Sequence, residues 1–357
     1  MTGRGIAVVL SGFPRRSETF ALAEVAALEN AGLLAAAFST KGGESGPLQP
    51  LARRLAPRVH RLDGTSAQQA QDAARLLSNT AVRGVHAYFA HAPADTAASL
   101  AALLGVPFGF SLHARDARKV PPATLHARAR SAACVVACNA DVARELDGSG
   151  ARVQIVPHGV DLRRFAPAPH PGGPRLRLLA VGRLVEKKGF HVLLDALAST
   201  PFPWQLRIVG EGPEGPRLEG QARTLGLLDR VSFAGALTHR ALPAAYAAAD
   251  VIVVPSILDR AGDRDGLPNV VLEAMACGRA IVASDLAAIP TALRHGETGV
   301  LVPPGNSRAL ADAIGRVGAD PELRASLGAA ARQSAVRSFD VRRCAARFTE
   351  VLREAYA

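Results

Sequence analysis

Short runs of β-branched and other apolar residues recur along the chain, separated by Ala- and Leu-rich segments with a helical period. Apolar runs that do not alternate with polar residues are typical of strands buried on both faces of a parallel sheet. The pattern therefore predicts an α/β fold of two doubly wound, Rossmann-like domains, one in each half of the chain. The runs expected to form strands are Ile6–Leu10, Leu34–Phe38, Val85–Phe89, Phe108–Leu112, Val135–Ala137, Val153–Val156, Leu176–Val181, Leu206–Val209, Val231–Ala234, Val251–Val254, Ala280–Ala283 and Val300–Val302.

A stretch rich in proline and glycine separates the two halves, between Pro167 and Pro174. Proline neither extends a helix nor donates to a sheet ladder, so the stretch predicts a linker at 169–174. We expect a first domain at 1–168 and a second at 175–338. The tail at 339–357 has apolar residues at helical spacing, which predicts a C-terminal helix packed against an existing core. We expect this helix to cross back to the first domain. Ligands of such sheets bind outside the carboxyl ends of the strands, so two facing domains would place a site between them.

The net charge of +11 comes almost entirely from scattered arginines, because the 357 residues include four lysines. Clustered cations and stacking aromatics would indicate nucleic-acid binding, but aromatic residues make up 4% of the chain and no reader motif occurs. We expect no nucleic-acid partner and favour a phosphate-bearing substrate or an anionic membrane surface. No apolar run approaches the ~18–20 residues that span a bilayer, and Met1–Leu10 has the pattern of a strand. The expected location is the cytoplasm, with peripheral contact to the inner face of the membrane.

The cysteines show no spacing typical of zinc ligands or of a redox pair. They are Cys134, Cys138, Cys277 and Cys344. We expect small buried thiols in a reducing compartment.

The most informative stretch of the second half runs from the strand Val251–Val254 through a polar loop into a helix that begins near Asn269. Proline suits a first helical turn, and the amides of Gly266 to Asn269 at the positive helix end would form an anion site. Glu273 lies further along this helix among apolar residues. It needs hydrogen-bond donors there, which a ribose diol would supply, although a structural salt bridge would serve equally.

Two further segments of the second half follow strands. Arg183 and Lys188 are five residues apart, so one loop would turn both toward a diphosphate, unless they belong to a solvated basic turn. Lys187 is expected to be the solvated lysine of the adjacent pair. Residues Gly210 to Gly215 match Gly-x-Gly-x-x-Gly, but Pro213 removes an amide and the motif does not open the first βα unit, so a dinucleotide site is disfavoured.

The first half carries polar residues at several expected strand ends. Gly12 and the segment Ser17-Glu18-Thr19 follow the first strand. His86 and Tyr88 lie within Val85–Phe89, and His91 follows it. His113 and Asp116 follow Phe108–Leu112. A lone histidine is often a structural residue, but several at strand ends favour a site.

Together these segments resemble glycosyltransferase family 4 of the GT-B fold over essentially the whole chain. The second half carries the specific motifs, which are Val181-Gly182-Arg183 with Lys188-Gly189, Val209-Gly210-Glu211-Gly212-Pro213, Gly266-Leu267-Pro268, Glu273-Ala274-Met275-Ala276 and Thr298-Gly299-Val300-Leu301-Val302. The segment around Ser17-Glu18-Thr19 resembles members that build exported polysaccharides, and His113 with Asp116 matches the acceptor-side histidine motif of the family. The second acid of the family, eight residues before Glu273, falls here on Asp265 in place of Glu.

The resemblance implies a set of site residues. The catalytic residues would be His113, Arg183, Lys188 and Asp265. The donor-binding residues would be Gly12, Arg183, Lys188, Gly210, Gly212, Asp265, Gly266, Leu267, Pro268, Asn269 and Glu273. The acceptor-side residues would be Ser17, Glu18, Thr19, His91, His113 and Asp116. No metal and no cofactor are expected beyond a nucleoside diphosphate sugar as co-substrate.

The implied reaction is retaining transfer of a sugar from that donor to a glycan or lipid-linked glycan, in the synthesis of cell-surface polysaccharide. No well-placed carboxylate pair indicates a double displacement, so front-face substitution is the hypothesis.

Two alternative functions remain open. The chain could be an isomerase or epimerase that acts on a nucleotide sugar, or a non-catalytic nucleotide-sugar-binding protein. A phosphorylase would need a lysine to bind pyridoxal phosphate. This function is disfavoured, because the chain has four lysines and two of them, Lys187 and Lys188, lie in the loop expected to bind the diphosphate. Asp263 and Asp265 form an Asp-x-Asp pattern that holds metal in another glycosyltransferase fold, but such spacing is common in polar loops.

Overall fold

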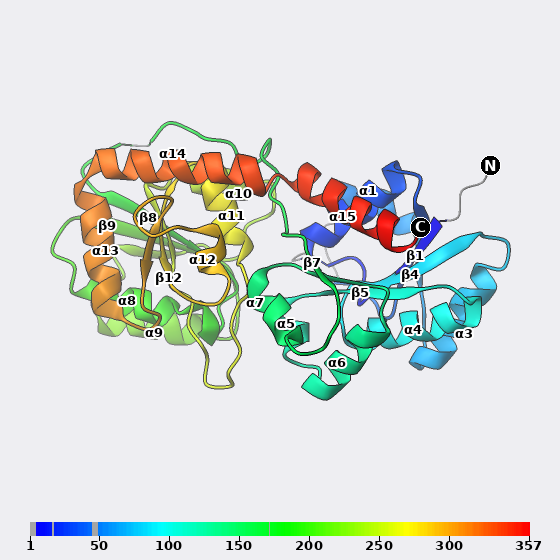
Figure 1. The fold of residues 1–357 in the computed structure, drawn as a ribbon. Coiled ribbons are helices and arrows are strands. Elements are labelled where there is room, and N and C mark those ends of the chain that lie inside the picture. Colours follow the sequence, from blue (N-terminus) through cyan, green and yellow to red (C-terminus); the bar gives the residue numbers. More distant parts are fainter. Residues whose placement is uncertain (1–4, 16–17, 45–48, 171) are drawn as a thin grey trace. The chain divides into compact units, whose positions relative to one another are not determined.

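The computed structural model describes residues 5–15, 18–44, 49–170 and 172–357, without the side chains of Arg115 and Asp116. The chain forms two compact units (Figure 1). Unit 1 comprises the first part of the chain up to Gly159 together with Val341–Ala357, and unit 2 comprises Val160–Asp340. Each unit is built on its own sheet.

Both sheets are doubly wound, and every strand pair in the described residues is parallel. The strand order is β3-β2-β1-β4-β5-β6-β7 in unit 1 and β10-β9-β8-β11-β12-β13 in unit 2. Each order reverses beside the first strand of its unit, which confirms the predicted Rossmann-like fold. The strands are β1 Gly5–Leu10, β2 Leu34–Ser39, β3 Val59–Arg61, β4 Val82–Ala87, β5 Phe108–Leu112, β6 Cys134–Ala137, β7 Val153–Ile155, β8 Leu176–Val181, β9 Trp204–Val209, β10 Val231–Phe233, β11 Val251–Val254, β12 Ala280–Ser284 and β13 Val300–Val302.

Helices connect the strands in both units (Figure 1). Short 3₁₀ turns lie at Ala56–Arg58, Arg144–Leu146 and Glu186–Lys188. The α-helices are α1 Thr19–Asn30, α2 Pro50–Leu55, α3 Ser66–Leu76, α4 Ala92–Leu104, α5 Ala114–Ala117, α6 Pro122–Ser131, α7 Ala140–Ala143, α8 Phe190–Ala198, α9 Gly215–Thr224, α10 Leu242–Ala247, α11 Asn269–Ala276, α12 Ile289–Ala292, α13 Ser307–Ala319, α14 Pro321–Ser338 and α15 Val341–Ala355. Among the described residues, no helix combines the length and the apolar character needed to cross a membrane.

Each sheet separates two buried clusters, one on each face. In β1, Ala7 and Val9 belong to one cluster, whereas Ile6 and Val8 belong to the other. Successive residues of a strand point to opposite faces, so a strand that is apolar throughout serves both clusters. This explains why the strands appear in the sequence as continuous apolar runs.

Two details of the first sheet differ from the sequence pattern. The edge strand β3 is missing from the prediction, because its three residues are partly or fully exposed and include His60 and Arg61. Strand β4 ends at Ala87, before the predicted end, since Phe89 has a φ of +153° that takes the chain out of the extended conformation.

The boundary between the units lies before the proline-rich stretch, not within it as expected. Val160 N–H donates to Phe339 O at 2.7 Å. Arg279 Nη2 donates to Ala168 O at 3.0 Å and to Pro169 O at 3.1 Å. These bonds attach the segment from Val160 to Pro169 to unit 2.

The C-terminal helix α15 packs back on unit 1, as predicted. It contacts α1, and its buried residues Phe348 and Leu352 belong to the same cluster as Ile6 and Val8. The apolar spacing in the tail was therefore a sufficient signal for this helix and its buried face.

Candidate active site

The loop that follows β9 packs closely against the loop that follows β8. Leu184 N–H donates to Glu211 O at 2.9 Å. A Cβ atom added at Gly210, whose φ is +144°, would lie 1.8 Å from Gly182 O. One added at Gly212 would lie 2.3 Å from Leu184 O. Both positions require glycine for this contact, because a side chain would displace the neighbouring loop. The packing thus accounts for glycines that also fit a dinucleotide motif.

Lys188 and Asp265 form an ion pair beside these loops. Lys188 Nζ lies 2.7 Å from Asp265 Oδ2, and the Lys188 stem lies over Gly182. Ser256 Oγ, after β11, donates to Asp265 Oδ2 at 3.4 Å. Burial by itself would raise the pKa of Asp265, but the ammonium groups of Lys188 and Lys187 outweigh it and hold this pKa below its usual value. Asp265 is therefore a charged carboxylate at neutral pH.

Lys187 is buried, so the expectation that it is solvated was wrong. Its Nζ lies 3.0 Å from Asp263 Oδ2 and 3.5 Å from Asp265 Oδ1. The loop after β11 reaches both lysines, because Ile257 N–H donates to Lys187 O at 2.9 Å. The carboxylates of the Asp-x-Asp pattern thus face ammonium groups, which disfavour a divalent cation at this position.

Arg183 is exposed at the carboxyl end of β8. Within the described residues, its side chain takes part in no hydrogen bond or ion pair. The guanidinium is therefore available to a ligand. Its joint action with Lys188 on one diphosphate stays a prediction.

Glu273 is buried in α11 and is held by a tyrosine. Tyr246, in α10, donates its hydroxyl to Glu273 Oε2 at 2.6 Å. Burial raises the pKa of Glu273 to about 6, although the Tyr246 hydrogen bond and the charge of Arg164 both lower it. In the part of the chain that the structure describes, Glu273 forms no ion pair and Oε1 has no hydrogen-bond partner. One carboxylate oxygen is thus left for a ligand.

The amino end of α11 has no side-chain cap. Pro268 occupies the N-cap position with a φ of −65°, and the helix begins at Asn269. The loop residues Gly266 and Leu267 precede it and are half-buried. Uncapped amides at a helix start favour an anion.

In unit 1, aromatic and histidine side chains gather at the carboxyl ends of the strands. His113 lies 4.9 Å from Phe89 between ring centroids, and His91 stacks on Phe89 at 5.5 Å. Phe20 stacks on His158 at 3.8 Å and lies 4.7 Å from His113. Burial lowers the pKa of His91 to about 4. The structure therefore brings His91 and His113 to one region around Phe89, and their acceptor-side role stays a prediction.

The first loop of unit 1 contributes a carboxyl group with a perturbed pKa. Glu18 Oε1 lies 3.3 Å from Arg15 Nε, and burial raises the pKa of Glu18 to about 7. Thr19 begins α1 next to it, and Gly12 follows β1. Ser17 and the side chain of Asp116 lie outside the described residues.

Two family models match consecutive parts of the chain. The model described as Glycosyltransferase Family 4 matches residues 17–164, and the model described as Glycosyl transferases group 1 matches residues 166–334. The chain belongs to the family 4 type of glycosyltransferases.

Similar proteins include two mycobacterial mannosyltransferases. The GDP-mannose-dependent alpha-(1-6)-phosphatidylinositol monomannoside mannosyltransferase of Mycolicibacterium smegmatis is 35% identical over 57% of this chain and 57% of its own length. The phosphatidyl-myo-inositol mannosyltransferase of Mycobacterium leprae is 40% identical over 56% of this chain and 54% of its own length. The match thus spans little more than half the length of these relatives.

Solved structures share the fold along the whole chain. Anabaena HepE in complex with UDP has a TM-score of 0.83 and 21% identity, and the match covers 99% of this chain and 100% of HepE. Sucrose-phosphate synthase from Thermosynechococcus elongatus has a TM-score of 0.81 and 23% identity over 99% of both chains. These likenesses establish a GT-B fold for the glycosyltransferase.

His86 belongs to the core of this glycosyltransferase and not to its site. It is fully buried within β4, with Nδ1 3.0 Å from Tyr356 Oη and Nε2 2.9 Å from Ser111 Oγ. Burial lowers its pKa to about 3. The strand ends later along the chain than this histidine, so its position was misjudged from the sequence.

Two contacts in the glycosyltransferase were not predicted. Tyr246 carries no local signal, because only the tertiary packing of α10 on α11 brings it to Glu273. His158 could have been found, since it follows β7 at the same edge of the sheet as His113 after β5. The two histidines are hydrogen-bonded, with His158 Nε2 3.1 Å from His113 Nδ1.

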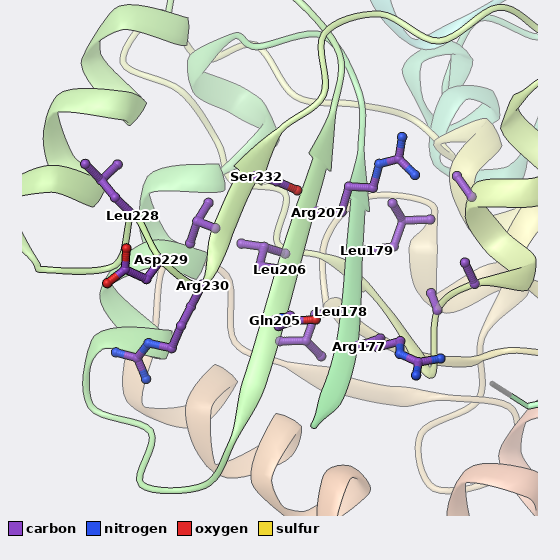
Figure 2. Close-up of a pocket in the computed structure, with 14 residues that line it drawn as sticks. Arg177, Leu178, Leu179, Gln205, Leu206, Arg207, Leu228, Asp229, Arg230 and Ser232 are labelled. Atoms are coloured by element: carbon purple, nitrogen blue, oxygen red, sulfur yellow. The ribbon is translucent and has the colours of Figure 1, made fainter. Parts of the chain in front are cut away.

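A cavity of about 370 Å³ lies elsewhere in unit 2 (Figure 2). Arg177 and Leu179 of β8 line it together with Gln205 and Arg207 of β9 and Ser232 of β10. None of the predicted donor residues belongs to its lining. The donor site that the sequence predicts is therefore expected at the loops at the carboxyl ends of the strands, and not in this cavity.

The raised pKa of Glu273 predicts a pH dependence of stability that a Glu273→Gln variant lacks. A carboxyl whose pKa is higher in the folded state stabilises the fold below pH about 4.5, and this contribution is lost as pH rises through about 6. The shift corresponds to about 2 kcal/mol. We therefore expect the free energy of unfolding of the wild type, relative to Glu273→Gln, to fall by that amount between about pH 4.5 and pH 7. Urea unfolding across this range measures it.

Tyr246→Phe serves as the control for this titration, because it removes a hydrogen bond that lowers the pKa of Glu273. In that variant the loss of stability should move to higher pH. Parallel stability curves for the wild type and Glu273→Gln would contradict the assignment.

Proposed function

We propose that the chain is a retaining hexosyltransferase that moves a sugar from a nucleoside diphosphate sugar to a glycan or lipid-linked glycan, in the synthesis of cell-surface polysaccharide. The observation that carries the proposal is the set of charges at the carboxyl ends of the strands of unit 2. Exposed Arg183 and the ammonium group of Lys188 suit a diphosphate. Glu273 Oε1, which has no partner in the described residues, suits a ribose hydroxyl.

The proposed roles follow from these positions. Arg183, Lys188 and the amides at the start of α11 would hold the diphosphate. Glu273 would accept a hydrogen bond from the ribose while Tyr246 fixes its orientation. Asp265 would position Lys188 through their ion pair and reach the donor sugar.

In the proposed step, the bond between the sugar C1 and the diphosphate oxygen breaks while the acceptor oxygen bonds to C1 on the same face. The departing diphosphate takes the proton of the acceptor hydroxyl and leaves as the nucleoside diphosphate. Negative charge grows on the leaving group, so cations aimed at it lower the barrier more than they tighten binding of the donor. Glu18, Thr19, His91 and His113 of unit 1 would bind the acceptor.

The names of the mycobacterial relatives agree with this substrate class. One is GDP-mannose-dependent, and both names describe a phosphatidylinositol-type acceptor. The proposal for this chain extends to the class of donor and acceptor and leaves the base and the sugar open.

A thermal-shift screen of the full chain tests the proposal. Nucleoside diphosphates and their sugar conjugates should raise the melting temperature, since a ligand at 100 times its Kd adds about 2.7 kcal/mol to stability. The dinucleotide NAD is the matched comparison, because it shares a diphosphate with the proposed donors. Stabilisation by NAD, with none by any nucleoside diphosphate, would overturn the proposal.

A further inference from the structure

Three side chains able to bind metal lie together at the carboxyl ends of neighbouring strands in unit 1. His113 follows β5, Cys138 follows β6 and His158 follows β7. One ligand atom from each residue lies within 4.8 Å of the other two. Residues far apart in the sequence thus converge on one point.

The two histidines of this cluster share a single proton. His158 Nε2 and His113 Nδ1 lie 3.1 Å apart, so one nitrogen donates and the other accepts. Burial lowers the pKa of His113 well below its usual value and that of His158 to about 3. Both rings are therefore neutral at pH 7. When the proton of the donating ring moves to the other nitrogen of that ring, both facing nitrogens carry a lone pair that a metal ion can accept.

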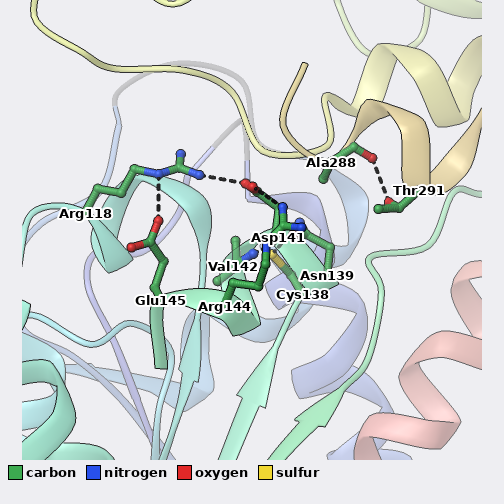
Figure 3. A network of polar contacts seen from close by, with 9 residues as sticks. All are labelled: Arg118, Cys138, Asn139, Asp141, Val142, Arg144, Glu145, Ala288 and Thr291. Atoms are coloured by element: carbon green, nitrogen blue, oxygen red, sulfur yellow. Dashed lines mark hydrogen bonds and ion pairs between the residues drawn. The ribbon is translucent and has the colours of Figure 1, made fainter. Parts of the chain in front are cut away.

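The loop that carries Cys138 is held in place by polar contacts (Figure 3). Asn139 Oδ1 accepts a hydrogen bond from Val142 N–H at 2.9 Å, which leaves its amide to donate to Cys138 Sγ at 3.3 Å. This contact holds the sulfur in position, as hydrogen bonds to ligand atoms do around metal sites. Arg118 holds the short helix α7 that follows this loop, with Nη2 2.7 Å from Asp141 Oδ2.

The separations fit a small tetrahedral site after modest adjustment. Zinc bonds of ~2.0–2.3 Å place tetrahedral ligand atoms roughly 3.3–3.6 Å apart. The two hydrogen-bonded nitrogens at 3.1 Å are already near this spacing, and the three ligand atoms lie within 4.8 Å of one another, so the sulfur has to approach by roughly 1.2–1.5 Å at most. Phe20 stacks on the ring of His158 with an interplanar angle of 6°, which restricts its rotation.

We propose that His113, Cys138 and His158 bind a thiophilic divalent metal ion, of which Zn²⁺ is the typical example, with water as the fourth ligand. Two imidazoles and one thiolate are soft and borderline donors that Zn²⁺ prefers over the oxygen-seeking Mg²⁺ and Ca²⁺. The inference does not rest on the proposed transferase reaction, because binding is measured without any substrate. Since ligation would occupy His113, bound Zn²⁺ should inhibit transfer and not support it.

Titration of the purified full chain with Co²⁺ tests the site, because a thiolate bound to Co²⁺ gives a charge-transfer absorption band in the near ultraviolet. We expect this band at one equivalent of Co²⁺ and its loss when Zn²⁺ is added. A wild-type chain that gives no such band with excess Co²⁺ overturns the proposal.

Variants identify the ligands. Cys138→Ser should abolish the band and weaken Zn²⁺ binding by more than about 100-fold, measured against a competing chelator. Cys134→Ser is the matched control and should retain the band. Cys134 is a buried thiol like Cys138, but it begins β6 and lies outside the cluster. His158→Gln should weaken binding of both metals. A band that persists in Cys138→Ser, or unchanged affinity in His158→Gln, contradicts the site, and thermal melting without metal shows that each variant is folded.

Discussion

Replacing Arg183 with alanine should lower kcat for sugar transfer by about 100- to 1,000-fold. The reason is that a cation aimed at the departing diphosphate acts on charge that develops in the transition state. The side chain is exposed and, in the described part of the chain, bonds to no other residue. The free energy of unfolding should therefore stay within about 0.5 kcal/mol of the wild-type value. Steady-state kinetics at saturating donor, together with urea unfolding, measure the two quantities.

Arg207→Ala is the matched control for this variant. Arg207 is also an exposed arginine, on the neighbouring strand β9, but it faces the cavity that holds none of the predicted donor residues. Its removal should leave kcat unchanged while lowering the net charge equally. Nearly full transfer activity in Arg183→Ala would remove Arg183 from the diphosphate site.

Most of the fold could be predicted from the sequence, because strands buried on both faces consist of continuous apolar runs. Strands such as β8 and β11 are apolar on both faces, so continuous apolar runs locate them. The residues of the edge strand β3 are partly or fully exposed, so this strand has no apolar run that would locate it in the sequence. The linker was misplaced for a different reason, since prolines mark where regular structure stops but do not show which unit the segment packs against. Bonds from Arg279 decide that, and they come from distant residues.

The candidate site could be predicted where motifs follow strand ends, but its pairings could not. Sequence position placed Lys188, Asp265 and Glu273 near carboxyl ends of strands in unit 2, and the contacts of Lys188 and Asp265 agree with that placement. The burial of Lys187 was missed. We expected this lysine to be solvated because its neighbour Lys188 was assigned to the diphosphate, but the loop that carries Asp263 covers it. Tyr246 was missed because a tyrosine in an alanine-rich helix has no pattern that sets it apart.

The two adjacent lysines should differ strongly in their effect on kcat when each is replaced by methionine. Lys187 Nζ already contacts two carboxylates, those of Asp263 and Asp265, whereas Lys188 Nζ contacts only Asp265 among the described residues. An ammonium group has three hydrogen-bond donors, so Lys188 retains more capacity for a diphosphate. Lys188→Met should therefore lower kcat by about 100-fold or more, and Lys187→Met should lower it only a few-fold.

Stability separates this catalytic effect from a structural one. Each variant removes a partner from a largely buried ion-pair network, a change that costs about 3–5 kcal/mol where no other cation compensates. The remaining lysine still faces Asp265, so both variants should lose comparable stability, toward the lower end of that range. Because stability is matched, a difference in kcat reports the contact with the donor. Equal losses of kcat in the two variants would mean that Lys188 acts only by holding Asp265, and the diphosphate would then depend on Arg183 and the start of α11.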